Sequence, residues 1–237
     1  MAEGCARSVV TSIRGIKMRP GYLVDKTEAQ DRVLAGARPL DLMAFSFKGQ
    51  AAGQLGMGYF NHVSVFVGDE TALRAAGVWN DPAVRPWQDT LRSGPMVIEA
   101  MRENVELAGR EAIFNADSVA VLRPQTLSRG RRQAALRDLF AMIGTPFDFH
   151  FDARTPDAVF CTEVPARVMP ELRLPLRELY GRPSYLPDET VARALQGKLP
   201  LRLVDFVLGG RNGWQGAGPQ ELAARILSYW PEDGGDE

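Results

Sequence analysis

The sequence predicts an α+β fold, with a small antiparallel sheet of about five or six strands packed by helices. Residues 62–68 (His-Val-Ser-Val-Phe-Val-Gly) alternate in character as a strand does. Residues 128–143 instead carry their apolar side chains at helical spacing. The polar and apolar alternation of the strands favours an antiparallel sheet that is covered on one face.

The elements before the main helix follow from local patterns. Residues 27–36 form a short helix that ends at Gly36. Strands are predicted near residues 41–47, 62–68, 96–101 and 117–123. The segment 48–60 carries four glycines, so we expect a mobile loop that borders the entry of the second strand.

The second half of the chain is predicted to be mainly helical. Ser128 is placed to cap the helix 128–143, and Gly144 follows its end. A short helix is expected to begin at Cys161 and to stop before Pro170, although Pro165 interrupts it early. Further helices are predicted near residues 188–196, 201–208 and 219–230.

Composition indicates an ordinary globular protein. The chain has 237 residues, 45% of them hydrophobic, and a formal net charge of −1, which gives no field that would attract nucleic acid. No apolar stretch is long enough for a signal peptide or a membrane span, so a cytoplasmic protein is expected. We predict an N-terminal arm (1–25), one catalytic domain with a C-terminal helical extension (26–230) and a disordered acidic tail (231–237). Oligomeric state stays open.

Two residues suggest nucleophilic chemistry. The chain holds two cysteines and two histidines, so a thiol nucleophile and its base have few candidates. Cys161 stands at the predicted start of a helix, whose free backbone N–H groups favour a thiolate. His62 stands at the entry of a strand, where its imidazole can face a cleft. Cys161 as an inert core residue and His62 as an ordinary strand-end histidine remain the alternatives.

Other polar residues have weaker patterns. Glu99 interrupts an apolar strand, where a buried carboxylate needs a partner, and both His62 and Arg123 are candidates. His150 is interpreted as part of a cleft wall, between the turn residues Asp148 and Asp152. His62, Glu99, His150 and Cys161 are metal-ligand types, but their spacing matches no zinc motif. Neither a metal nor a cofactor is therefore expected.

Five segments together resemble the permuted branch of the NlpC/P60 papain-like superfamily, the YiiX/YebB-like cysteine hydrolases. They are residues 40–45, 62–68, 97–100, 144–149 and 160–164, with a weaker similarity at 185–188. The resemblance implies a circularly permuted papain-like fold with the nucleophile at a helix N-terminus. It also implies Cys161 as nucleophile, His62 as base and Glu99 as the residue that orients His62.

The function expected from this resemblance is hydrolysis of an amide bond, in a peptide or an acyl amino acid, through an acyl-enzyme. A lipid-directed thiol acyltransferase or esterase is the first alternative, because related permuted enzymes act on lipid esters. The substrate would then be a small acyl, peptide or lipid-like molecule. A catalytically silent binding module is the alternative from another class.

Overall fold

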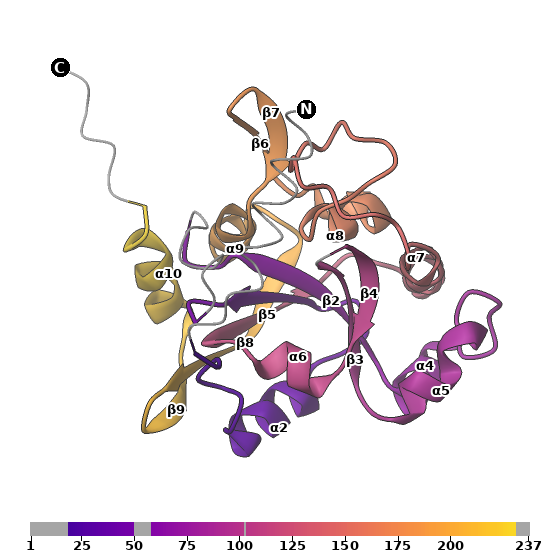
Figure 1. Ribbon diagram of the computed structural model, residues 1–237, viewed down its shortest axis with the longest axis horizontal. Coiled ribbons are helices and arrows are strands. Elements are labelled where there is room, and N and C mark those ends of the chain that lie inside the picture. The colour runs from indigo at the N-terminus through magenta and orange to yellow at the C-terminus, as the bar shows by residue number, and fades with distance from the viewer. Residues whose placement is uncertain (1–18, 50–57, 102, 231–237) are drawn as a thin grey trace.

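Figure 1 shows the computed structural model, in which residues 19–49, 58–101 and 103–230 are described. Its centre is a seven-stranded sheet in which every paired neighbour is antiparallel. From edge to edge the order is β4 (Asn104–Ala108), β3 (Met96–Met101), β2 (His62–Gly68), β1 (Leu42–Ser46), β5 (Ser118–Pro124), β8 (Leu201–Gly210) and β9 (Gly213–Gly216). A separate hairpin pairs β6 (Leu176–Leu179) with β7 (Arg182–Tyr185). The predicted antiparallel α+β architecture is confirmed.

Helices lie on both sides of this sheet (Figure 1). Their bounds are α2 (Thr27–Gly36), α4 (Glu70–Ala76), α5 (Gln88–Arg92), α6 (Arg110–Phe114), α7 (Arg129–Ala141), α8 (Glu163–Val168), α9 (Pro187–Leu195) and α10 (Pro219–Leu227). Two 3₁₀ turns cover Arg85–Trp87 and Pro170–Leu172. The main predicted helix is present as α7, with Ser128 accepting a hydrogen bond from the backbone N–H of Arg131.

The sheet has a hydrophobic core on each face, so the expectation of a single covered face is wrong. The larger core packs α7, α8, α9 and α10 against residues such as Val63 and Val65 of β2. The smaller core packs α2 and α6 against residues such as Phe45 and Phe66. Because alternate residues enter different cores, every residue of β1, β2 and β5 is buried.

The helix expected over 201–208 is instead strand β8. It pairs with β5 from Leu201 to Leu208, and Phe206, Val207 and Leu208 are all buried. Arg202 and Asp205 interrupt the apolar residues at a spacing that fits a helix as well as a strand, and periodicity alone does not separate the two. Pairing with β5 decides the outcome.

Residues 19–25 lie against the sheet. Leu23 is fully buried, and Arg19 forms an ion pair with Asp117 at the start of β5. Gly21 approaches the backbone of Ala116 so closely that a Cβ atom there would lie 2.3 Å from its nitrogen. The predicted division of the chain at residue 25 stays a prediction. Residues 1–18, most of the glycine-rich loop (50–57) and the acidic tail lie outside the described residues.

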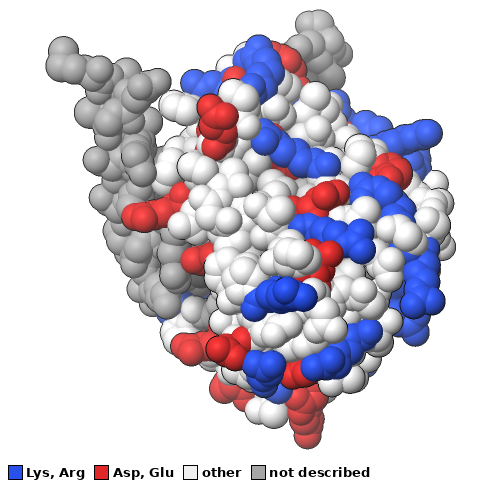
Figure 2. Space-filling model, turned by 90° about the vertical axis from the view of Figure 1, so that its right-hand side faces the viewer, with Lys and Arg blue, Asp and Glu red and all other residues white. Residues whose placement is uncertain are grey.

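The face that carries α4, α5 and α7 has mixed charge. Figure 2 shows Lys and Arg side chains there interspersed with Asp and Glu. On α7, Arg131 pairs with Glu171, and Arg132 donates to the carbonyl oxygens of Leu127 and Pro124. These arginines hold neighbouring segments together. Within the described part of the chain, no helix combines the length and the apolar character that crossing a bilayer requires.

Candidate active site

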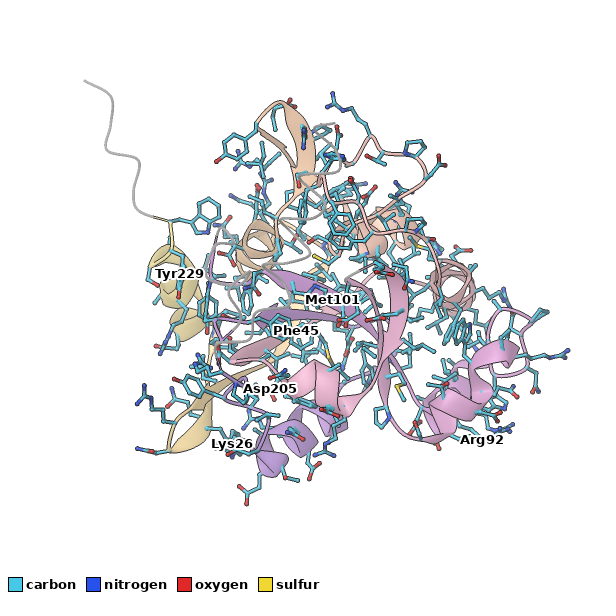
Figure 3. The ribbon with its side chains drawn as sticks, viewed as in Figure 1. Lys26, Phe45, Arg92, Met101, Asp205 and Tyr229 are labelled. Atoms are coloured by element: carbon cyan, nitrogen blue, oxygen red, sulfur yellow. The ribbon has the colours of Figure 1, made fainter. Side chains whose placement is uncertain are left out.

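His62 is the first residue of β2, opposite Phe45 of β1. The rings of Phe45 and Phe47 pack against the imidazole, with centroids 6.1 and 5.8 Å away. Asn61 secures the strand entry, because its N–H donates to Phe45 O and its side-chain oxygen accepts from the N–H of Phe47. Figure 3 shows Phe45 near the centre of the molecule, close to Met101 at the end of β3. His62 is consequently held in a buried, aromatic setting.

Glu99 lies on β3, directly after Ile98, which pairs with Val65 of β2. This register brings the Glu99 carboxylate beside the imidazole, and Glu99 Oε2 lies 2.6 Å from His62 Nε2. The other candidate partner, Arg123, instead forms a buried ion pair with Asp41. The structure therefore settles the partner of Glu99, which is His62.

Cys161 approaches His62 from a different part of the chain. It precedes α8, which the structure places in the larger core. The His62 ring and the backbone N–H of Val63 act on its thiol at close range, and both lower the thiol pKa. Because Nε2 faces Glu99, Nδ1 is the ring nitrogen that remains for the thiol. His62 thus lies between Cys161 and Glu99.

The helix after Cys161 begins later than expected. It starts at Glu163, with Thr162 at the cap position, so Pro165 is its third residue. Thr162 makes no side-chain capping bond, and its hydroxyl lies 3.7 Å from Cys161 Sγ. Cys161 is therefore not the first residue of a helix, and the groups that lower its pKa are the His62 ring, the backbone N–H of Val63 and the Thr162 hydroxyl.

The electrostatics favour an ion pair. Burial works to lower the pKa of His62, but the charge of Glu99 and hydrogen bonds to Cys161 and Glu99 raise it to about 10. Burial works to raise the pKa of Cys161, but its hydrogen bond with His62 and the charge of that ring lower it to about 7. Near neutral pH the arrangement holds a thiolate next to an imidazolium, which is the reactive state of a cysteine nucleophile.

His150 has a different environment from the one that the sequence suggested. The residue is exposed, and its backbone binds Asp148 and Arg182. Asp148 accepts two backbone N–H groups, as expected of a turn residue. His150 is not among the groups that shift the pKa of His62 or Cys161. Among the described residues, no group of three or more His, Cys, Asp and Glu side chains is arranged to hold a metal ion.

Two contributors to the site were missed in the sequence. One is the backbone N–H of Val63, which no side-chain pattern can reveal. The other is Asp188, which the sequence placed only at the start of a helix. Asp188 is buried, and its carboxylate accepts the backbone N–H groups of Tyr59 and Phe60, just before His62.

Comparison with known proteins now gives three findings. The model of the permuted papain-like amidase family (YaeF/YiiX, C92) matches residues 43–222. Among solved structures, a crystal structure described as the metalloprotein yiiX from Escherichia coli O157:H7 is 16% identical, with a TM-score of 0.45, and the match covers 77% of this chain and 97% of that one. Among curated proteins, none matches significantly.

Proposed function

This chain belongs to the permuted papain-like amidase family, and on that premise we propose that it is a cysteine amidase. In this proposal Cys161 is the nucleophile, His62 is the base and Glu99 orients His62. The observation that carries it is the continuous contact from the Cys161 thiol through the imidazole to Glu99 Oε2, with a 2.6 Å bond at its far end. A base that is oriented by a third group is the arrangement that nucleophilic catalysis needs.

The proposed reaction has two steps. The Cys161 thiolate attacks the amide carbonyl carbon, the C–N bond breaks, and the His62 imidazolium gives its proton to the leaving amine. His62 then takes a proton from water as the water oxygen attacks the thioester carbon, and the C–S bond breaks. The carboxylic acid leaves, and the Cys161 thiolate and the His62 imidazolium are restored. The sum is amide plus water giving carboxylic acid plus amine. Glu99 holds the imidazole in place and stabilises the imidazolium.

The thiol lies in a largely buried position. Cys161 retains only 7% of its accessible surface, and the aromatic ring of Phe160 beside it packs on Phe151 and Tyr185. Exclusion of water strengthens the interaction between the thiolate and the imidazolium. The limited access to the thiol also favours a substrate with a small acyl group over a bulky, folded one.

The proposal is tested with a panel of acyl-amino-acid amides, short peptides, acyl esters and thioesters. Each is incubated with the wild-type chain and with Cys161→Ala, and intact mass is recorded after rapid acid quench. We expect amide turnover and a mass increase equal to the acyl group, both absent from Cys161→Ala. Ester or thioester turnover without amide turnover would favour the acyltransferase or esterase alternative. If Cys161→Ala retained both signals, that result would contradict the thiol mechanism.

A further inference from the structure

A buried carboxylate holds the chain segment that leads into β2. Asp188 is the second residue of α9 and retains only 2% of its accessible surface. Its two oxygens accept the N–H groups of Tyr59 and Phe60 at 2.6 and 2.7 Å, and also the indole N–H of Trp230 at 2.8 Å. These donors come from two segments that are far apart in the sequence.

Hydrogen bonds from three donors offset the unfavourable burial of this carboxylate. Burial raises the pKa of Asp188, and hydrogen bonds from Phe60, Trp230 and Tyr59, together with the charge of Lys48, oppose that rise. An unpaired carboxylate at such a position would be strongly unfavourable. The three bonds therefore constrain one another, and loss of one weakens the whole arrangement.

Neighbouring contacts attach the end of the C-terminal helix to the same segment. Lys48 donates to Gly58 O at 2.7 Å, and its ammonium lies 4.3 Å from the centre of the Tyr229 ring. The Tyr229 ring also packs edge-on against Tyr59. Figure 3 shows Tyr229 at the end of α10. Trp230 and Tyr229 both lie beyond residue 222, where the family match ends.

Gly58 is adapted to the carboxylate. Its φ is +92°, and a Cβ atom at this position would lie 2.4 Å from Asp188 Oδ2. Side chains rarely adopt this backbone conformation, and here one would also displace the carboxylate. The backbone of 58–60 and the position of Asp188 consequently depend on each other.

We propose that Asp188 is a positioning residue for His62, on which it acts through the backbone of Tyr59 and Phe60. Pairing between β1 and β2 begins at His62 itself, opposite Phe45, so the segment 59–61 that leads into the strand sets where the imidazole enters the site. Within that segment Asn61 is bonded to β1, and Tyr59 and Phe60 are bonded to Asp188. Asp188 fixes both of their N–H groups from α9. The inference rests on the proposed function, because it assigns Asp188 a part in aligning His62 with Cys161.

The test measures the reactivity of Cys161, and therefore needs no substrate. All variants are made in a Cys5→Ser background, so that Cys161 is the one thiol, and iodoacetamide alkylation is followed by mass from pH 5 to pH 10. Among the described residues, Glu99 and Cys161 are the charged groups that act most strongly on His62, and Lys48 is the charged group that acts most strongly on Asp188. Complete loss of the imidazolium would raise the thiol pKa from about 7 to its ordinary 9.0 or above, because burial alone raises it.

That change would lower the thiolate fraction at pH 7 by about fiftyfold or more, and a partial misalignment of His62 would lower it less. For Asp188→Asn we expect about a tenfold slower alkylation at pH 7. The midpoint, the pH at which the alkylation rate is half of its maximum, should shift upward. Asp41→Asn is the matched control, because Asp41 is also fully buried and accepts a backbone N–H. It lies at the far end of β1 from Phe45 and should keep the wild-type midpoint.

A pair of glycine variants tests the same idea without changing a charge. Gly58→Ala should displace Asp188 and raise the midpoint. Gly144→Ala should not, because Gly144 has nearly the same φ, +93°, but open space around the added Cβ. This pair decides the question if Asp188→Asn does not fold.

The outcomes separate the two proposals. Folded Asp188→Asn and Gly58→Ala proteins with wild-type alkylation profiles would overturn the positioning role, even if both melt at lower temperature. A wild-type Cys161 that titrates as an ordinary thiol would overturn the proposed function itself. Raised midpoints in these two variants, with both controls unchanged, support the role of Asp188.

Discussion

Replacement of Glu99 by Gln tests the part of the site that depends on charge. The substitution preserves the shape of the side chain and a hydrogen-bonding group near His62 Nε2. It removes the negative charge that, against the effect of burial, raises the pKa of His62 to about 10. Without that charge, burial favours the neutral imidazole, and a neutral ring no longer stabilises the Cys161 thiolate.

The size of the effect follows from the thiol. If the pKa of Cys161 rises from about 7 toward its ordinary 9.0, the thiolate fraction at pH 7 falls by up to about fiftyfold. A misoriented imidazole lowers proton transfer further, and the equivalent change in a catalytic triad costs about 10⁴-fold. We therefore expect amide turnover to fall by roughly ten- to ten-thousand-fold, with alkylation at pH 7 falling by roughly fiftyfold.

The assay compares Glu99→Gln with Glu106→Gln. Glu106 lies directly opposite Glu99 on β4, so its replacement removes a carboxylate from the neighbouring strand but leaves the bond to His62 in place. Turnover and alkylation should stay within about threefold of wild type in Glu106→Gln, since the bond between Glu99 and His62 is retained. Wild-type turnover in a folded Glu99→Gln protein would refute the orienting role and leave a dyad of Cys161 and His62.

Four further predictions follow from the described contacts. The kcat/KM profile should rise through pH about 7, as Cys161 loses its proton, and fall through pH about 10, as His62 loses its own; a single rising limb up to pH 10 would contradict the ion pair. Cys161→Ala should lose turnover but keep its melting temperature, because it removes one small atom group. Arg123→Met should lower the free energy of unfolding by about 3–5 kcal/mol in a denaturant titration, because Asp41 stays buried without its partner. Trp230→Phe, which loses one donor to Asp188, should slow alkylation less than Asp188→Asn does.

The parts of the fold that were predictable are those with a local signal. The 62–68 strand alternates, and the 128–143 helix has a capping serine and apolar residues at helical spacing. Both reflect the periods of the backbone itself. The 201–208 segment has no such signal, because Arg202 and Asp205 interrupt its apolar residues at a spacing compatible with both a helix and a strand. Only its partner, β5, determines that it is a strand.

The candidate site likewise contains residues that could be predicted from the sequence and contacts that could not. His62 and Cys161 could be singled out because the chain has so few histidines and cysteines, and the resemblance to a family supplied their order. The partner of Glu99 could not be read from the sequence, because it depends on which strands are neighbours. Arg123 lies on β5, and β1 and β2 both separate β5 from β3. That order places the Arg123 guanidinium on Asp41 at the start of β1 and leaves Glu99 for the imidazole.

Asp188 shows why a positioning group is harder to find than a reacting one. A reacting group must have a particular chemistry, so its residue type is a signal. A positioning group needs only to be rigid and correctly placed, and Asp188 contacts backbone N–H groups 128 and 129 positions earlier in the chain. Tyr59 and Phe60 contribute N–H groups that any residue other than proline would supply. The role of Asp188 is therefore recognised from the path of the backbone between Gly58 and His62, which only the folded chain reveals.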